Sequence, residues 1–138
     1  MPAPKNPLLP EFFVYRLEVG DVPFYVGVGR AARASDRVRY VRYLMSREAR
    51  GLPVTWNLSC GAVAELLRAG CEVTVAHAAK GLPRSAAAAR EREEIARLVA
   101  AGTVLANKHH NPRPPQSAGE VAQAVLERVA AQTPNKAL

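Results

Sequence analysis

Cysteine is scarce in this chain. The two cysteines, Cys60 and Cys71, lie eleven positions apart and form neither a Cys-x-x-Cys pair nor a Cys/His spacing typical of a metal site. This scarcity argues against a structural zinc site and against a disulfide scaffold. We therefore expect both thiols to be reduced and buried, which is the usual state of a free cysteine.

Long apolar runs and a recognisable signal segment are also missing. No apolar run approaches the roughly 20 residues that a membrane-spanning helix requires. The first ten residues, MPAPKNPLLP, contain four prolines and lack the apolar stretch of a secretory signal. The sequence therefore predicts an irregular N-terminal arm at 1–10 and a cytoplasmic protein.

Acidic residues and lysine are in short supply. There are 12 acidic residues against 19 basic ones, fifteen of the basic residues are arginine, and the formal net charge is +7. A guanidinium group binds phosphate through two parallel hydrogen bonds. A GC-rich genome would by itself favour arginine over lysine, but it does not account for the excess of positive charge. That excess favours an anionic partner, and nucleic acid is the commonest class.

The residues that are present form the pattern of one α+β domain. The chain has 138 residues and 49% of them are hydrophobic, which is enough for a single core. Aromatic and β-branched residues predict three strands, at 12–19, 22–27 and 71–78. Apolar spacing and capping residues predict four helices, at 30–50, 57–68, 85–100 and 118–131.

These elements predict a small, mainly antiparallel three-stranded sheet flanked by helices. Gly20-Asp21 turns the first two strands into a hairpin, and Pro23 favours an edge or early position in the second strand. The domain spans 11–107, and 108–138 adds a loop and a C-terminal helix that we expect to pack on the core. The expected buried face of that helix is Val121, Val125, Leu126 and Val129.

Helix ends are marked by capping residues. Asn57 or Ser59 is expected to cap the second helix, because a short polar side chain accepts a hydrogen bond from the first helical turn. Ser85 is expected to cap the third helix for the same reason.

One glutamate interrupts an apolar helix face. At 100° per residue, Glu91 falls in the middle of the stripe that Ile95 and Leu98 belong to, while Glu94 lies at its margin. A carboxylate on such a stripe is costly unless it is paired or binds a metal. A tilt of the helix, or pairing with an arginine at the edge of the core, would also explain the position. Glu91 is therefore a candidate functional residue.

Arginines crowd the first helix directly after Gly27 and Gly29. Arg30, Arg33 and Arg37 lie at i, i+3 and i+7, where the helix N-terminus also favours an anion. The spacing predicts a phosphate-binding cluster at this end of the helix.

Further basic and aromatic residues follow on the same helix. The later arginines indicate a solvated basic face or simple attraction to a nucleic-acid backbone: Arg39, Arg42, Arg47 and Arg50. Tyr40 and Tyr43 lie between them, and we expect both to be packing residues rather than base stackers.

Two tyrosines, Tyr15 and Tyr25, lie in the adjacent hairpin strands. Phe13-Val14-Tyr15 and Tyr25-Val26-Gly27 resemble the two name-giving motifs of the GIY-YIG nuclease family, and the two tyrosines are ten residues apart. Gly29 and Arg33 resemble the subset of that family written YVGKGxGxR. The resemblance implies an α+β nuclease fold.

Two later motifs extend the resemblance. The segment 87–95, AAAREREEI, is similar to the family's (A)xxxExxxI helix and places its metal-binding glutamate on Glu91. Residues 105–107, LAN, resemble the LxN element and place its asparagine on Asn107. Val28 departs from the pattern, since the family often has a lysine or other polar residue there. Arg30 or Arg37 is a candidate source of the missing positive charge.

The resemblance implies hydrolysis of a DNA phosphodiester with one Mg²⁺ or Mn²⁺. Tyr15 would accept the proton of the attacking water, and Tyr25 would hydrogen-bond in the same cluster. Arg33 would stabilise charge on the phosphate, and Glu91 would hold the cation. Asn107 would support the site, as would Gly27 and Gly29, and Arg30, Arg37, Arg39 and Arg42 would contact the nucleic acid.

Two other interpretations stay open. One is a nucleic-acid-binding module on the same scaffold without catalysis, which Val28 favours. The other treats the same residues as structural parts of a basic scaffold or assembly protein. The sequence is compatible with a monomer or a homodimer.

Overall fold

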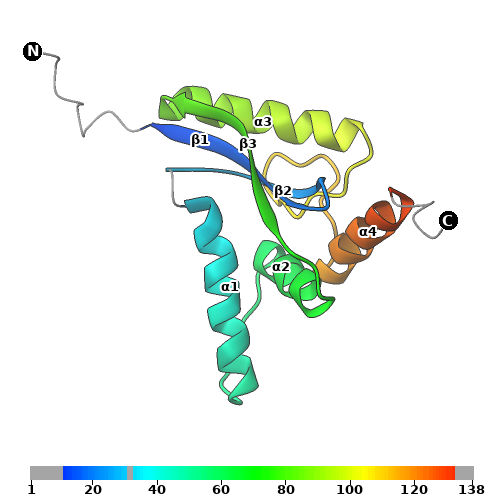
Figure 1. The fold of residues 1–138 in the computed structure, drawn as a ribbon. Helices are drawn as coiled ribbons and strands as arrows, with labels where there is room; N and C mark the ends of the chain where they lie inside the picture. The colour runs from blue at the N-terminus through cyan, green and yellow to red at the C-terminus, as the bar shows by residue number, and fades with distance from the viewer. Residues whose placement is uncertain (1–10, 31–32, 133–138) are drawn as a thin grey trace, which may run out of the picture.

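The chain forms an antiparallel sheet packed with four helices (Figure 1). The computed structural model describes residues 11–30 and 33–132. The strands are β1 (Phe12–Val19), β2 (Val22–Gly29) and β3 (Thr74–Leu82), in the order β2-β1-β3. The helices are α1 (Arg33–Ala49), α2 (Leu58–Arg68), α3 (Arg84–Ala100) and α4 (Ala118–Ala131). The predicted α+β class with a three-stranded antiparallel sheet is confirmed.

Helices cover both faces of the sheet (Figure 1). On one face, Val14 and Val26 pack against Ile95 and Leu98 of α3. The opposite face packs on the other three helices through a larger cluster that includes Leu17 and Phe24. Because both faces are covered, β1 and β2 are apolar on both sides, and this is why their sequences show little alternation.

The β1–β2 hairpin closes with a tight two-residue turn. Val19 pairs with Val22, and Gly20 and Asp21 both adopt positive φ, at 52° and 67°. Two successive residues in this region give a turn whose twist matches that of the strands. The pairing of β1 with β2 shifts register between Leu17 and Glu18, next to Pro23. Strand β2 lies at the edge of the sheet, as the position of Pro23 predicted.

Several predicted boundaries differ from the structure. β2 continues to Gly29, and α1 begins at Arg33 rather than at Arg30. β3 continues through Gly81 because the pairing with β1 is irregular there and Gly81 takes a φ of 66°. Asn57 caps α2 by accepting from the Cys60 backbone N–H at 2.8 Å, as expected.

The predicted cap of α3 is wrong. Pro83 occupies the cap position, with a φ of −60° and no capping side-chain hydrogen bond, and Ser85 lies inside the helix. The fixed φ of proline is compatible with the start of a helix, so no polar side chain is needed there.

The buried face of α4 is rotated from the expected one. Val121, Ala122 and Val125 are buried, whereas Leu126 is 39% exposed. Val129 is partly buried and its methyl groups lie 3.6 Å from where a side chain at Gly20 would begin. The small Ala122 therefore takes the core position that Leu126 was expected to fill, and α4 packs against α2 and β2.

Two smaller observations concern the cysteines and the helices. Cys60 is buried as expected, but Cys71 is only partly buried. None of the helices in the described part of the chain is long and apolar enough to cross a bilayer.

Candidate functional site

Tyr15 and Tyr25 come together across the hairpin. Tyr15 pairs with Gly27, and Tyr25 pairs with Leu17, so the two tyrosines are diagonal neighbours on one face of the sheet. Their ring centroids are 6.4 Å apart and the rings are tilted by 45°. Tyr15 is only 4% exposed, while Tyr25 is partly buried. The predicted tyrosine pair therefore exists as a contact.

Gly27 is the residue that makes room for Tyr15. A Cβ atom at Gly27 would lie 2.4 Å from both Cζ and Oη of Tyr15. The phenol ring thus lies directly over the β2 backbone, where no other residue fits. Gly27 is needed for this close approach and not for an unusual φ.

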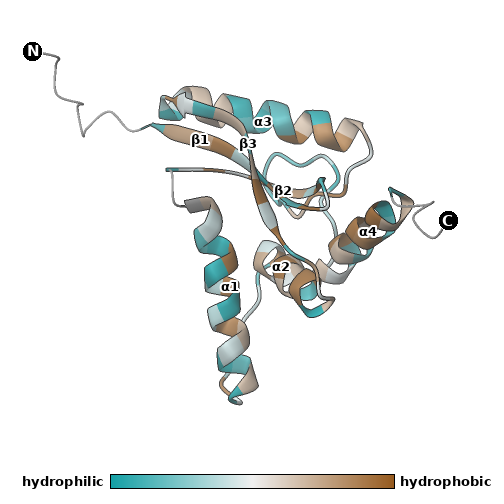
Figure 2. Ribbon diagram, in the orientation of Figure 1, coloured by the Kyte–Doolittle hydropathy of each residue, from teal (hydrophilic) through white to brown (hydrophobic). Residues whose placement is uncertain are grey.

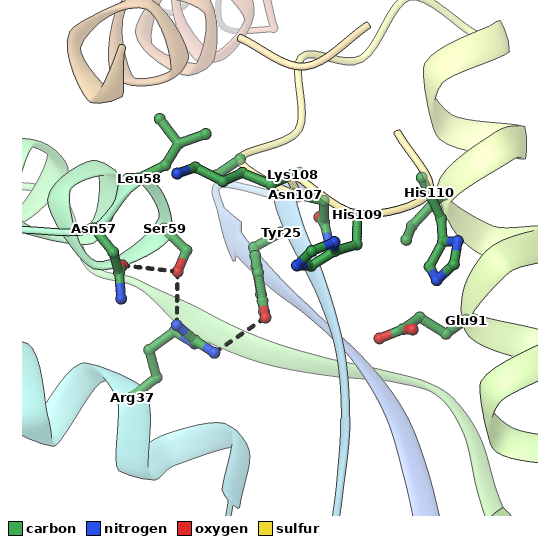
Figure 3. A pocket seen from close by; sticks show the side chains of 12 residues that line it. Tyr25, Arg37, Asn57, Leu58, Ser59, Glu91, Asn107, Lys108, His109 and His110 are labelled. Atoms are coloured by element: carbon green, nitrogen blue, oxygen red, sulfur yellow. Dashed lines mark hydrogen bonds between the residues drawn. The ribbon is translucent and has the colours of Figure 1, made fainter. Parts of the chain in front are cut away.

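Arg37 holds the tyrosine pair from the side of α1 (Figure 3). Its Nη2 donates to Tyr25 Oη at 3.0 Å, and its Nη1 donates to Ser59 Oγ at 2.7 Å. Its Cζ lies 4.4 Å from the centroid of the Tyr25 ring. Burial lowers the pKa of Arg37, but Tyr25, Tyr15 and Cys60 more than offset this, so the net pKa is raised and the guanidinium stays charged.

The environment keeps Tyr25 protonated in the free protein. Burial raises the pKa of Tyr25 above its ordinary value of 10.0, and Tyr15 and Glu91 raise it further, while Arg37 opposes them. Tyr25 is therefore a neutral phenol at physiological pH. Arg37 by itself therefore does not make Tyr25 an effective proton acceptor in the free protein.

Glu91 reaches the same place from α3 (Figure 3). Its carboxylate extends toward Tyr25 and Arg37, and it lines two cavities that these residues also line. Burial raises the pKa of Glu91, although Arg92 and His109 oppose that shift. Glu91 is half-buried and makes no hydrogen bond or ion pair to a side chain within the described residues. A partly desolvated carboxylate that no described side chain binds is what a bound cation would stabilise.

Glu94, and not Glu91, is the fully buried carboxylate of α3. The prediction that Glu94 lies at the margin of the apolar face is wrong, because the helix turns Glu94 toward the sheet and leaves it 0% exposed. Arg16 Nη1 and Arg97 Nε each donate to its carboxylate at 2.7 Å. Burial would raise the pKa of Glu94, but these two hydrogen bonds lower it overall. The sequence suggested that Glu91 could pair with an arginine at the edge of the core, but in the structure it is Glu94 that pairs with arginines.

Asn107 joins the loop after α3 to the edge of β2. Its Oδ1 accepts from the Val26 backbone N–H at 3.0 Å, and its Nδ2 donates to the Val26 carbonyl at 2.8 Å. The side chain therefore occupies the hydrogen-bonding edge where another strand would pair. Asn107 is the residue on which the LxN resemblance places the family's asparagine.

A second asparagine shapes the following loop. Asn111 is buried, and its Nδ2 donates to the backbone carbonyls of Leu105 and Asn107 at 3.1 and 2.8 Å. His110 adopts a φ of 60°, which non-glycine residues rarely do. The loop consequently presents three side chains to the cavity that contains Glu91, namely Lys108, His109 and His110.

Two adjoining cavities define the site. The first has a volume of 470 Å³ and the second 400 Å³, and both are lined by Tyr25, Arg37, Asn57 and Glu91. The second is also lined by Tyr15 and by Val28. Val28, where the resemblance led us to expect a polar residue, borders this cavity and also packs against the cluster under α3.

The other predicted residues are distributed differently. Arg33 opens α1, but its side chain lies outside the described residues. Arg30 is exposed, with its Cζ 5.8 Å from the centroid of the Phe12 ring, and Gly29 ends β2 opposite Phe13. Arg39 and Arg42 are exposed on α1. Of the two arginines considered as the missing charge, Arg37 is the one that contacts a tyrosine.

Several lining residues escaped sequence reasoning. Asn57 was noted as a cap, but its place beside Arg37 depends on how α2 packs against α1. Ser59 was likewise noted only as a cap, although it binds Arg37. Adjacent histidines in a proline-rich segment, such as His109 and His110, are typical of a loop or of contact with nucleic acid. Their position next to the Asn107 motif was the signal that could have placed them at the site.

Comparison of the chain with protein-family models, with curated proteins and with solved structures gave no match.

Proposed function

We propose that this protein is a metal-dependent endonuclease that hydrolyses DNA phosphodiester bonds. The observation that carries the proposal is the convergence of Tyr15, Tyr25 and Glu91 on adjoining cavities, with Arg37 bonded to Tyr25. These residues come from β1, β2, α3 and α1. The resemblance of their motifs to the GIY-YIG family supports the same reading, as does the net charge of +7.

Glu91 fits the requirements of a single divalent cation. No group of three His, Cys, Asp or Glu side chains able to hold a metal occurs among the described residues. A site with one carboxylate suits Mg²⁺ or Mn²⁺, which keep several waters and bind the substrate's phosphate oxygens. When bound, such a cation would offset negative charge on the scissile phosphate and on the leaving oxygen.

The protein's own residues would then position and deprotonate the attacking water. Tyr15 is the proposed proton acceptor, held by its packing on Gly27, and Tyr25 orients the cluster through its bond to Arg37. Arg37 places a fixed positive charge next to Tyr25, whereas Val28 contributes none. Lys108 and the proposed clamp Arg33 would bind the phosphate oxygens.

A plasmid-nicking assay with Mg²⁺ or Mn²⁺ tests the proposal. We expect the wild type to nick DNA only with metal, and Tyr15→Phe, Arg37→Gln and Glu91→Gln each to lose most of that activity. Glu93→Gln is the matched control, because Glu93 is exposed on the same helix. If wild-type protein cleaves no DNA form with either metal, the enzyme proposal is wrong.

The alternative of a non-catalytic nucleic-acid-binding module rests on two observations. Val28 places an aliphatic side chain at the site, and burial leaves Tyr25 protonated. Under this alternative, DNA binding is retained and salt-sensitive, but no variant or metal changes the DNA itself. The same assay, run beside a binding measurement, separates the two.

A further inference from the structure

Two tyrosines of α1 are not packed in the core. Tyr40 is 54% exposed and Tyr43 is 53% exposed, so neither of these expected packing residues belongs to the core. The core side of α1 is instead occupied by Val41 and Leu44, which are buried, and by the partly buried Val38. The planes of the two tyrosine rings are close to parallel, with centroids 6.4 Å apart and an interplanar angle of 28°. We call this pair the tyrosine platform.

The tyrosine platform begins at the candidate site. Tyr40 lines the 400 Å³ cavity together with Tyr15, Arg37 and Glu91. Tyr40, Tyr43 and Arg47 are spaced at i, i+3 and i+7, so they follow one face of the helix away from that cavity. Helix α1 projects away from the sheet (Figure 1), and both tyrosines are exposed on it.

The surroundings of the tyrosine platform are positively charged. Arg39 and Arg42 are exposed on α1 and Arg50 is exposed directly after it, and Arg47 Nη1 donates to Tyr43 Oη at 3.5 Å. The helix has only two acids. Asp36 lies 3.7 Å from Arg39, and Glu48 is bonded to Arg68 and to the Trp56 ring N–H. The hydrophilic outer side of α1 is visible in Figure 2.

We propose that the tyrosine platform stacks on unpaired bases of DNA next to the scissile phosphate. This inference rests on the proposed function, and it narrows the substrate to DNA that has a single-stranded segment beside the cleavage point. Aromatic side chains combined with cations bind single strands, because each unpaired base offers a free π-face and each nucleotide a phosphate. Bases inside an intact duplex are already stacked and present no such face. Intact duplex would contact only the arginines.

Binding to fluorescent oligonucleotides, in buffer without divalent metal, tests the proposal apart from cleavage. The probes are a labelled oligothymidine and a blunt duplex of matched length. We expect the wild type to prefer the single strand, and Tyr40→Leu/Tyr43→Leu to reduce that preference by about tenfold or more. Tyr40→Phe/Tyr43→Phe keeps both rings and should retain the preference. Circular dichroism of each variant establishes that it is folded.

Three outcomes would overturn the proposal. In the first, the leucine variant loses single-strand and duplex binding equally. In the second, the phenylalanine variant loses as much as the leucine variant, since hydroxyl contacts and not stacking would then be responsible. In the third, sedimentation shows a dimer that the leucine variant dissociates while DNA binding is unchanged, and the platform is then an interface with a second copy.

Cleavage measurements separate this inference from the proposed function. If the phenylalanine and leucine variants differ in single-strand binding but no metal-dependent cleavage occurs, base stacking on the tyrosine platform is supported and the nuclease proposal is wrong. If wild-type protein cleaves intact duplex as fast as DNA with a single-stranded flap, the nuclease proposal is supported and the proposed role of the tyrosine platform is wrong.

Discussion

Glu91 and Glu94 lie one helical turn apart on α3, and their pKa values shift in opposite directions. Burial raises the pKa of Glu91, and nothing among the described side chains binds its carboxylate. For Glu94 the effect of burial is outweighed by hydrogen bonds from Arg97 and Arg16, which lower its pKa. Glu94 is therefore held in place by arginines, whereas Glu91 is a charge at a cavity that no described side chain binds.

The raised pKa of Glu91 predicts a gain in stability when its charge is removed. A group with a raised folded pKa contributes its full stability below its ordinary pKa of 4.5 and loses it as the pH rises through the folded value. At pH 7 the ionised Glu91 is therefore unfavourable, and we expect Glu91→Gln to raise Tm. The same change should lower metal-dependent cleavage by more than about 100-fold.

Thermal unfolding with and without Mn²⁺ checks both halves of the Glu91 prediction. Metal should raise the Tm of the wild type and of Glu93→Gln but not of Glu91→Gln, because only a bound cation stabilises the folded state. Near pH 4 the Tm difference between wild type and Glu91→Gln should shrink. An equal metal-induced shift in Glu91→Gln would place the cation elsewhere.

Gly27 offers a second test at the residue scale. A methyl group there would overlap Tyr15, with Cβ only 2.4 Å from its Oη, so the ring must move. We expect Gly27→Ala to cost about 1–3 kcal/mol of stability, the usual effect of overpacking. We also expect it to abolish cleavage, since Tyr15 is the proposed proton acceptor.

Gly119 is the matched control for Gly27. It lies in α4, and a Cβ there would meet only Ser117 Oγ at 3.9 Å. Gly119→Ala should leave cleavage unchanged and stabilise the helix by about 0.5–1 kcal/mol. Urea unfolding and the nicking assay report the two quantities. Full cleavage by Gly27→Ala would show that the ring position of Tyr15 is irrelevant to the reaction.

At the scale of elements, Glu94 ties α3 to the central strand of the sheet. Arg16 of β1 bonds both Glu94 and Glu18, at 2.7 and 2.8 Å, and the pKa of Arg16 is raised mainly by Glu18. Because β1 is the middle strand, this bridge also fixes the helix that carries Glu91. The position of Glu91 at the cavity therefore depends on a contact made one turn away.

Glu94→Gln tests that dependence. Removing one charge of a buried, hydrogen-bonded pair typically costs about 3 kcal/mol or more, and we expect a loss of this size in urea unfolding at pH 7. A group with a lowered folded pKa contributes its stability above its ordinary pKa of 4.5 and loses it as the pH falls through the folded value. The difference between wild type and variant should therefore shrink in acid. A difference that is the same at pH 7 and in strong acid would contradict the ionic origin.

The elements themselves were largely predictable from the sequence, but their rotations were not. The strands, the hairpin turn and the Asn57 cap depend on the types of neighbouring residues in the sequence. They can be predicted because these local preferences do not depend on how the elements pack together. The apolar pattern of a helix fixes its rotation about the helix axis only to within some tens of degrees. For this reason the pattern predicted Glu94 at the margin of the apolar face and Leu126 in the core, and both are placed differently in the structure. The partner that fixes Glu94 is Arg16, 78 positions away, and no local pattern encodes that contact.

The candidate site was predictable in part for the same reason. Tyr15, Tyr25 and Glu91 carry motif spacing, and the structure brings them to adjoining cavities. The roles of Arg37 and of His109 depend on how α1 and the loop after Asn107 are packed. Tyr40 was misplaced because the spacing of α1 allows an aromatic ring on either side of its apolar stripe.

At the scale of the whole molecule, we expect DNA binding to depend more on where the positive charges lie than on the net charge. The net charge is +7, and exposed arginines of α1 lie on the helix that also contributes Arg37 and Tyr40 to the cavities. DNA bound at the cavities would therefore extend along α1. Nonspecific attraction by the total charge would instead be insensitive to which arginine is removed.

The salt dependence of DNA binding distinguishes these two cases. Each phosphate contact that is lost lowers the slope of log affinity against log salt concentration by ~1. We expect Arg42→Gln and Arg39→Gln each to reduce the slope by about that amount, and the double variant by ~2. Arg128→Gln, on α4, removes the same charge from a helix that is not part of either cavity, and it should leave the slope unchanged. If Arg128→Gln lowers the slope as much as Arg42→Gln, the DNA does not follow α1 and binding reflects the total charge alone.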